Sequence, residues 1–510
     1  MTQSIGDGRG SRREQISYQG MYDPLVAHRA RVLDPSRATR RRSRNDEGAL
    51  VEARLEPTIY VSDSVLVAAN PTDDDEGLRG FMEFVGTLGV DAQIEPTNAE
   101  AYERGGGSDN ERPSSWVTQL QLSPTDGTAI AIDAWSLIQQ YRAAIEAELT
   151  DDPPNWVRNP VEVGLDHLMS ATIGGQTKTA GGTKTAGGTK TAGGGVSNEY
   201  VLPGLGGRTP VGYVGPAPAR RDGLKVRPVV ALLDTGVGRH PWLEDGVELL
   251  PGIADDGSET HGVVHNRLEG NLDDFSGHGT FIAGLIRQTC PYADLAMIKV
   301  MGADGLVAES RLIVELEHLA TDHRNGTRPL AAVSLSLGYY HETSDEEKTA
   351  SILGALKNLA QYEVALVVSA GNDSTDRPMY PPAFALDIPE LISVGATNPN
   401  GTVALFSNAG PWVSTYWSGA QLFSNLPART DKSPGFDAAA QATANASYDG
   451  RERETLDMDD FTAGFATWSG TSFAAPAFLG QCLQLHLDGR DQSPSSLLRL
   501  LRDVATTHRR

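Results

Sequence analysis

From residue 226 onward, short apolar runs alternate with helical periodicity, and this alternation constrains the fold more than any other feature. The run at 229–233 is apolar at every position, which is typical of a parallel strand buried on both faces. Strands are predicted at 229–233, 295–300, 331–337, 364–368 and 391–394, with helices between them at 281–286, 312–319 and 352–359. This spacing predicts an α/β domain with a doubly wound, mostly parallel sheet and helices on both faces.

A smaller domain is predicted upstream, over residues 57–170. Its strand-like runs are separated by two segments with helical periodicity, and the first helix begins after an acidic cluster that suits a helix N-terminus. The predicted strands are 58–61 with 64–68, 91–95, 116–122 and 161–168, and the helices lie near 76–88 and 134–145. The order β-α-β-β-α-β predicts a small ferredoxin-like α+β domain.

Composition divides the rest of the chain. Residues 1–55 are polar, basic and unpatterned, and we predict a disordered arm; contact of its arginines with nucleic acid or lipid is the alternative. Residues 171–200 contain three Thr-Lys-Thr-Ala-Gly-Gly repeats, which predict a flexible linker. Residues 201–505 form the large domain. A polar insertion at 413–467 interrupts it and is interpreted either as a lid or as a disordered excursion.

Charge and composition exclude several classes of protein. The net charge of -23 argues against nucleic acid and anionic membranes as partners. No stretch reaches transmembrane length and the N-terminus lacks an apolar signal region, so a cytoplasmic location is expected. Cys290 and Cys482 follow apolar helical runs and are predicted to be buried packing residues, with a single disulfide as the alternative. The oligomeric state is not indicated by any sequence feature.

Four polar segments are expected at the carboxyl ends of the predicted strands, where ligands bind in such sheets. Asp234 follows the first buried strand, His278 lies between two glycines, and Asn372 follows the strand at 364–368. Ser472 lies in the first turn of an apolar helix, where free N–H groups favour a developing negative charge. Each segment alone fits an ordinary turn or helix cap. Together they supply a nucleophile, a base, an orienting carboxylate and an amide donor.

The chain resembles the subtilase family of serine proteases over roughly residues 225–485, in four segments: Asp234-Thr235-Gly236, Gly277-His278-Gly279-Thr280, Gly371-Asn372 and Gly470-Thr471-Ser472. The order of the acid, the base and the nucleophile is also that of subtilisin. The resemblance implies that Ser472 is the nucleophile, His278 the general base and then acid, and Asp234 the residue that orients the imidazole. It further implies an oxyanion site made by the Asn372 side chain and the backbone N–H of Ser472. The implied reaction is hydrolysis of a peptide or protein substrate by an endopeptidase through an acyl-enzyme.

The resemblance also implies which residues bind the substrate. An extended peptide would pair with a segment formed by Ser334, Leu335, Ser336, Leu337 and Gly338. Ala370 and Gly371 would line the same cleft. Met379, beside a Tyr380–Pro381 bond where the family often has a cis proline, is expected at the floor of the first specificity pocket. Met379 would favour small or medium apolar side chains and Asp373 would attract basic ones, so the specificity stays open.

Departures from the family pattern concern metal binding and regulation. The helix after His278 lacks the calcium loop that many subtilases insert, so no cofactor is expected and calcium is not supported. His261 and His265 are interpreted as solvated loop residues. The small domain resembles a subtilase prodomain, which implies a latent enzyme with residues 170–174 near Ser472; a permanent regulatory module is the alternative. A non-catalytic binding protein on the same fold is the competing function, and it predicts loss of a catalytic residue.

Overall fold

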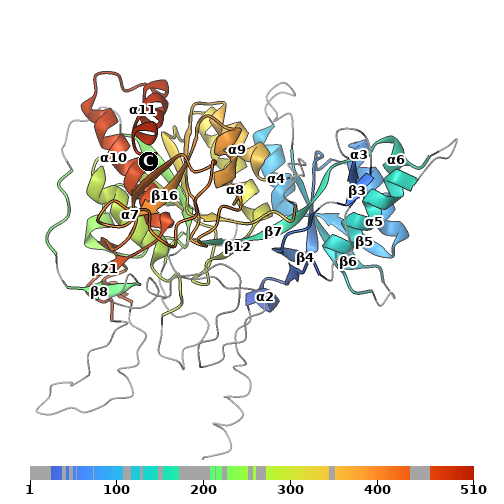
Figure 1. The fold of residues 1–510 in the computed structure, drawn as a ribbon, viewed down its shortest axis with the longest axis horizontal. Helices are drawn as coiled ribbons and strands as arrows, with labels where there is room; N and C mark the ends of the chain where they lie inside the picture. Colours follow the sequence, from blue (N-terminus) through green and yellow to red (C-terminus); the bar gives the residue numbers. More distant parts are fainter. Residues whose placement is uncertain are drawn as a thin grey trace, which may run out of the picture.

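The protein is described by a computed structural model in which two bodies of secondary structure lie side by side (Figure 1). The structure describes residues 24–36, 42–44, 50–52, 54–72, 74–106, 116–126, 130–147, 153–171, 207–212, 214–220, 227–250, 257–259, 272–343, 351–436 and 460–509. The smaller apolar core draws its buried members from Leu33 to Leu165, whereas the larger core draws most of its members from Val230 onward. Each body therefore has a core of its own.

The larger body is built on a seven-stranded sheet in which every neighbouring pair of strands is parallel. The order is β10-β11-β9-β13-β15-β16-β17, so the chain winds outward from β9 in both directions. The strands are β9 (Val229–Asp234), β10 (Val247–Leu250), β11 (Asp294–Lys299), β13 (Ala332–Leu335), β15 (Ala365–Ser369), β16 (Leu391–Thr397) and β17 (Thr415–Ser418). The predicted doubly wound parallel sheet is confirmed.

Two layers of helices cover this sheet (Figure 1). The helices α7 (His278–Thr289) and α10 (Thr471–Asp488) pack on each other and on the strands of one face, and α8 (Glu309–Arg324) packs with α9 (Leu353–Ala360) on the other. Apolar side chains on several sides of α7 and α10 bury both helices deeply, which fits their sequences. None of the described helices is both long and apolar enough to cross a bilayer.

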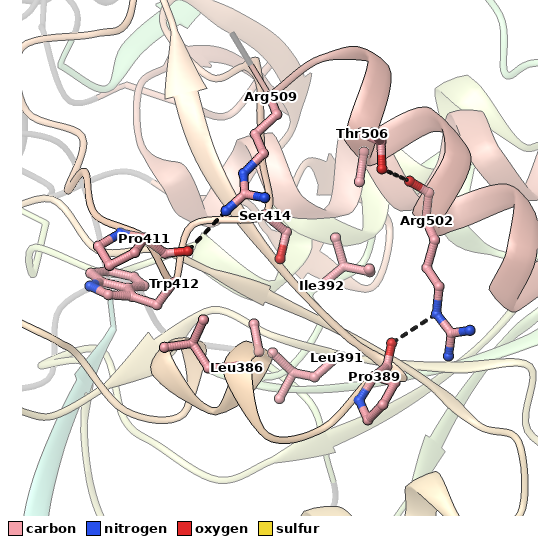
Figure 2. A pocket seen from close by; sticks show the side chains of 12 residues that line it. Leu386, Pro389, Leu391, Ile392, Pro411, Trp412, Ser414, Arg502, Thr506 and Arg509 are labelled. Carbon is pink, nitrogen blue, oxygen red and sulfur yellow. Dashed lines mark hydrogen bonds between the residues drawn. The ribbon is translucent and has the colours of Figure 1, made fainter. Parts of the chain in front are cut away.

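The helix α11 (Pro494–Thr507) closes the C-terminal side and contacts α10, β16 and β17. A pocket lies between α11 and the turn η3 (Pro382–Leu386). In Figure 2, Arg502 of this helix and Arg509, which follows its end, donate to the carbonyl oxygens of Pro389 and Pro411, at 3.0 and 3.1 Å. None of the residues lining this pocket is a predicted site residue.

The smaller body is an antiparallel sheet with the strand order β7-β4-β6-β5. This is the predicted ferredoxin-like arrangement, in which the first and last strands lie next to each other. Its strands are β4 (Thr58–Val67), β5 (Val90–Ile94), β6 (Thr118–Pro124) and β7 (Val163–Ala171), and its helices include α3 (Glu76–Thr87), α5 (Ala134–Ala147) and α6 (Asn155–Arg158). The core is centred on Phe81 and Tyr141, whose ring centroids are 4.9 Å apart.

The two bodies share one sheet. The short strands β12 (Leu306–Ala308) and β14 (Leu337–Gly338) come from the larger body, yet both pair antiparallel with β7. A helix that the sequence did not predict, α4 (Pro96–Gly105), packs on α8. There Val314 of α8 is buried among Ala101, Tyr102 and Trp116. This polar helix has few apolar residues, and most of its contacts with other elements are with α8 of the larger body.

The N-terminal region differs from the expected disordered arm. The structure places a short helix α2 (Pro24–Ala27) and a strand β1 (Ala30–Leu33) that pairs with β4, and β2 (Arg42–Arg44) pairs with β3 (Leu50–Glu52). Arg29 binds Asp63 at 2.7 Å. The sequence did not predict β1 because the segment is basic and polar; within the strand, the guanidinium of Arg31 lies 3.5 Å from the carboxylate of Asp133. Residues 1–23, 37–41, 45–49 and 53 of the arm lie outside the described ones.

The polar insertion is shorter than predicted. Residues 415–418 form β17 at the edge of the large sheet, and β18 (Leu422–Asn425) pairs with β21 (Phe465–Trp468), which also pairs with β8 (Thr209–Val211). A two-stranded ladder follows, formed by β19 (Arg429–Thr430) and β20 (Ser433–Pro434). These strands are too short and polar to show in the sequence pattern. Residues 437–459, which carry the lid hypothesis, and residues 172–200 of the predicted linker lie outside the described residues.

Candidate active site

The carboxylate that ends β9 lies against the imidazole that begins α7. Oδ1 of Asp234 is 2.8 Å from Nδ1 of His278 and also accepts the backbone N–H of Thr235 at 2.8 Å. Both side chains are buried. A carboxylate at Nδ1 holds the ring proton there and leaves a lone pair on Nε2, the arrangement that a general base requires. Nε2 itself is buried and has no hydrogen-bond partner among the described residues.

The start of α7 is held in place by its glycines. Gly277 adopts a φ of 83°, a conformation that favours glycine, so the chain turns sharply into the helix. The next glycine, Gly279, donates its N–H to Oγ1 of Thr235 at 2.9 Å, which ties the helix to the loop after β9. A Cβ at Gly279 would collide with the carbonyl oxygen of Gly236. Three aromatic rings surround the imidazole: Phe275, Trp468 and Phe473.

Ser472 lies in the first turn of α10 and is buried, next to the loop that carries Asn372. The N–H of Thr471 donates to Oδ1 of Asn372 at 2.9 Å, and the N–H of Gly371 donates to Oγ1 of Thr471 at 3.1 Å. Because Oδ1 is taken by Thr471, the amide nitrogen of Asn372 is directed away from that contact. This nitrogen is buried without a hydrogen-bond partner among the described residues. It is therefore a donor available for a developing anion.

A second amide, which the sequence did not reveal, supports this loop. Oδ1 of Asn408 accepts the backbone N–H of Asp373 at 2.9 Å, and its Nδ2 donates to the carbonyl of Ala370 at 3.0 Å. Asn408 is fully buried. In the sequence, Asn408 stands two residues after the apolar Phe406. This pattern is too common to mark the residue as functional. We infer that Asn408 fixes the backbone on both sides of Asn372.

Glu259 is a second residue that the sequence did not reveal. Its carboxyl is buried, accepts the N–H of Gly277 at 2.8 Å, and lies 3.0 Å from Oγ1 of Thr280. Burial raises the pKa of Glu259 to about 8; hydrogen bonds from Gly277, Thr280 and Thr235 oppose this rise, and the charge of Asp234 adds to it. The carboxyl therefore connects the two loops that carry the acid and the base. It stands in a polar loop without periodicity, so no pattern identified it.

The structure divides the predicted substrate-pairing segment in two. Ser334 and Leu335 belong to β13, a buried strand inside the parallel sheet, so they are not at an open edge. Leu337 and Gly338 form β14, whose edge is paired with β7. The sequence could not distinguish the two halves of the segment, because the apolar residues of both halves are buried. Within the predicted segment, only Leu337 and Gly338 are seen to pair with a strand outside the parallel sheet.

Met379 lies between the two predicted substrate-binding segments. It is buried, and a Cβ added to Gly338 or to Gly371 would collide with its side chain. Ala370 belongs to the same small apolar cluster. The Tyr380–Pro381 peptide bond is cis, as the resemblance implied. Met379 thus fills the space that two glycines leave open.

Asp373 is engaged within its own loop rather than presented as a free charge. Its Oδ2 accepts the hydroxyl of Tyr340 at 2.6 Å, and the guanidinium of Arg377 lies 4.8 Å from the centre of the Tyr340 ring. Burial raises the pKa of Asp373, while Tyr340 and Arg377 oppose that rise. A carboxyl held in this way attracts a basic substrate side chain less than the sequence suggested.

No metal or cofactor site is evident among the described residues of the cleft. One group of side chains elsewhere, His167, His341 and Glu342, has ligand atoms close enough to hold an ion. His261 and His265 lie outside the described residues. Cys290 and Cys482 are free and buried, and burial raises the pKa of both thiols. Neither cysteine is therefore a reactive thiolate.

The sequence model of the Subtilase family matches residues 226–486, about half of the chain, and this range includes Asp234, His278, Asn372 and Ser472. Upstream of it lie the ferredoxin-like body and the linker.

Known relatives and solved structures show the same likeness. The chain is 29% identical to subtilisin BL of Lederbergia lenta over 212 residues, which cover 39% of this chain and 67% of that protein. It is 32% identical to subtilisin-like protease 9 of Arthroderma benhamiae over 169 residues, covering 32% of this chain but only 39% of that one. A cold-adapted subtilisin-like serine proteinase is similar over 54% of this chain and 81% of its own, at 21% identity and a TM-score of 0.37. Fervidolysin from Fervidobacterium pennivorans, described as a keratinolytic enzyme related to subtilisin, is similar over 86% of this chain and 57% of its own, at 18% identity and a TM-score of 0.46.

Proposed function

Because this chain belongs to the subtilase family, we propose that it is a serine endopeptidase whose catalytic residues are Asp234, His278 and Ser472. The observation that carries the proposal is the 2.8 Å contact between Asp234 and Nδ1 of His278, which leaves Nε2 buried and without a hydrogen-bond partner in the described part of the chain. Family membership supports serine peptidase activity; the residue roles are our assignment.

The proposed residues supply the groups that each step of acyl transfer needs. Nε2 of His278 takes the proton of the Ser472 hydroxyl as Oγ bonds to the substrate carbonyl carbon, and Asp234 stabilises the imidazolium that forms. The side-chain N–H of Asn372 donates to the oxyanion. The imidazolium then returns the proton to the leaving amine as the C–N bond breaks. Water, deprotonated by the same nitrogen, hydrolyses the acyl-enzyme and restores the serine.

Hydrolysis of casein, an unfolded protein, tests this assignment. Ser472→Ala should lower kcat by about 10⁶-fold, the figure known for subtilisin within this family. The matched control is Ser495→Ala, an exposed serine on α11, which should leave kcat unchanged. Casein hydrolysis that survives Ser472→Ala would show that another residue is the nucleophile.

We also propose that the N-terminal body keeps the enzyme latent. The last residues of β7 lie between two strands of the larger body: Ser170 pairs with Leu306 on one side and Gly338 on the other, and Ala171 pairs with Leu337. Ser336, next to this edge, donates its hydroxyl to the carbonyl of Ser472 at 3.0 Å. The chain's own strand thus occupies the backbone groups that a substrate would use.

This arrangement supports a cut within residues 172–174, just after the paired segment. N-terminal sequencing of the incubated protein should find a new terminus there, and Ser472→Ala should leave the chain whole. An intact wild-type chain that hydrolyses casein at full rate would contradict latency by the N-terminal body. Peptidase activity itself would still stand.

Two further elements complete the proposal. Met379 fills the space beside Gly338 and Gly371, so we propose a preference for small side chains before the cut. An intracellular site of action, as expected from the sequence, fits the free thiols of Cys290 and Cys482. Cell fractionation with an antibody against the chain tests the location. Recovery of the mature enzyme in the culture medium would contradict it.

A further inference from the structure

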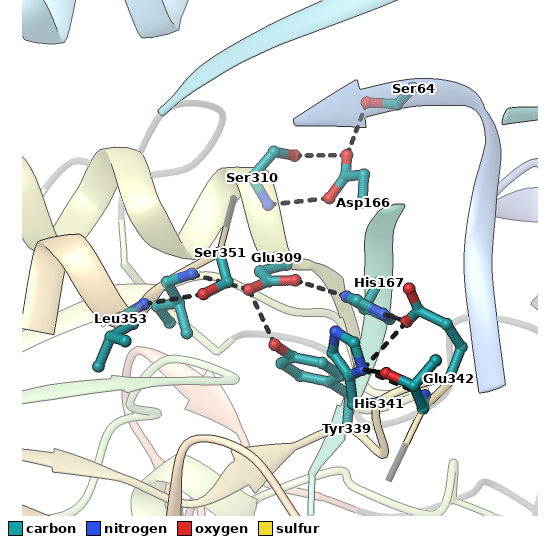
Figure 3. A network of polar contacts seen from close by, with 12 residues as sticks. Ser64, Asp166, His167, Glu309, Ser310, Tyr339, His341, Glu342, Ser351 and Leu353 are labelled. Carbon is teal, nitrogen blue, oxygen red and sulfur yellow. Dashed lines mark hydrogen bonds and ion pairs between the residues drawn. The ribbon is translucent and has the colours of Figure 1, made fainter. Parts of the chain in front are cut away.

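A buried polar network crosses the junction between the two bodies. His167 lies on β7, while Glu309 begins α8 and His341 and Glu342 follow β14 (Figure 3). The side chains of His167, Glu309 and Glu342 are at most 1% exposed, and that of His341 is 11% exposed. Both bodies thus contribute ionisable groups to one site, which opens toward solvent only at His341. The proposed peptidase mechanism uses none of them.

We propose that His167, His341 and Glu342 form a zinc site that ties the N-terminal body to the peptidase body. Nε2 of His167 is 2.9 Å from Oε2 of Glu342, and Nδ1 of His341 is 3.5 Å from the same oxygen. All three ligand atoms lie within 4.8 Å of one another. Zn²⁺ bound tetrahedrally at about 2.0–2.1 Å places neighbouring ligand atoms about 3.3 Å apart. The two separations that involve Oε2 of Glu342 are therefore within about 0.4 Å of those in a tetrahedral zinc site.

The surrounding groups prepare the two imidazoles for metal binding. Nδ1 of His167 is 2.8 Å from Oε2 of Glu309, the carboxylate–histidine pairing that commonly orients a metal ligand and leaves Nε2 to the ion. Nδ1 of His341 accepts the backbone N–H of Thr343 at 3.2 Å, so this nitrogen carries a lone pair rather than a proton, and zinc would replace that hydrogen bond. The ring of Tyr339 stacks on His167 at 4.1 Å and restricts its rotation. Binding displaces the proton on Nε2 of His167 to solvent.

The chemistry of the ligands selects the ion. Two imidazoles and one carboxylate suit Zn²⁺, whereas Ca²⁺ and Mg²⁺ prefer sets of oxygen ligands. A fourth position is left for water. Because one ligand comes from β7 and two from the peptidase body, bound zinc opposes separation of the two. An effect of zinc on activity rests on the proposed latency, whereas the existence of the zinc site does not.

The test uses the full chain with Ser472→Ala, which keeps the protein uncut. After treatment with EDTA, equilibrium dialysis against ZnCl₂ at neutral pH should give one tightly bound ion per chain, with a matching rise in Tm. Adding His341→Ala should weaken this binding at least tenfold, since it removes a ligand while His167 keeps both carboxylate partners. The matched control adds His28→Ala instead. His28 also bonds across the junction, to Asp304 at 2.8 Å, and its loss should not affect zinc.

The outcomes separate the site from its consequence. Absence of saturable binding, or equal binding in the parent, His341→Ala and His28→Ala chains, would overturn the site and leave the network as ion pairs. If the site is present, zinc should delay casein hydrolysis by the wild-type chain at least tenfold, and His341→Ala should abolish the delay. Zinc binding without such a delay would show that zinc does not keep the N-terminal body in place on the peptidase body. Failure of the peptidase proposal would instead appear as no hydrolysis in zinc-free protein.

Discussion

The amide of Asn372 gives the sharpest quantitative prediction. Its Oδ1 accepts the N–H of Thr471 at 2.9 Å, and its Nδ2 is buried without a hydrogen-bond partner among the described residues. Asn372→Asp keeps the acceptor for Thr471 but removes the donor. Loss of one such donor costs about 2.7–4 kcal/mol of transition-state stabilisation, or about 10²–10³ in kcat, a figure measured in subtilisin and carried over to this member of its family. KM should change little because the donor binds the oxyanion rather than the ground-state carbonyl.

A comparison of two variants separates catalysis from folding. Asn372→Ala also leaves the buried N–H of Thr471 unpaired, so it should lose about 1–3 kcal/mol of unfolding free energy in addition to the catalytic effect. The control is Asn358→Ala, which removes another buried amide, bonded to Glu317 at 2.6 Å, and should lower stability without lowering kcat. Steady-state kinetics on casein, with active enzyme counted by titration, and urea unfolding provide the data. A kcat for Asn372→Asp within threefold of wild type, or an effect confined to KM, would refute the assignment.

Three further predictions follow from burial and charge. Met379→Gly should raise the Leu-to-Ala ratio of kcat/KM at the position before the cut by up to about 50-fold, since three more carbons are buried at about 0.8 kcal/mol each; an unchanged ratio in a peptide-library assay would place the pocket elsewhere. The folded protein holds the proton of Glu259 up to about pH 8 while the unfolded chain releases it near 4.5, so the free energy of unfolding should fall as pH rises between these values. Urea unfolding of Glu259→Gln should lack this component, and the same slope in both proteins would contradict it. Val314→Asp, which places a carboxylate among Ala101, Tyr102 and Trp116, should shorten the lag before casein hydrolysis; an unchanged lag would show that this contact does not hold the N-terminal body.

The parallel sheet was predictable because its central strands are continuous apolar runs, as at 229–233. Strands at edges were not: β17 and β18 are short and half polar, and their pairing depends on neighbours far along the chain. The helix α4 was missed for a similar reason, since its few apolar residues pack on Val314 of α8 as well as on Trp116 of its own body. Patterns local in sequence therefore predicted elements whose own residues are strongly apolar. They failed for elements whose burial depends on contacts with distant parts of the chain.

The same distinction between local motifs and long-range contacts applies to the candidate active site. Asp234, His278, Asn372 and Ser472 stand in short motifs whose glycines and strand ends are visible in the sequence. Glu259 acts through contacts made across the fold, to residues 18 and 21 positions away. Asn408 is likewise 38 positions from Ala370. The edge formed by Ala171 and Leu337 could not be predicted either, because antiparallel pairing over such a separation leaves no local pattern.

The central claim is that Ser472 is an activated nucleophile. The most direct test is labelling of the activated protein with a fluorophosphonate, followed by mass spectrometry of the intact chain and of its peptides. The account predicts one adduct per chain, on Ser472, lost in Ser472→Ala and strongly slowed in His278→Ala. A protein that hydrolyses casein but carries no adduct, or carries it on another residue, would contradict the account.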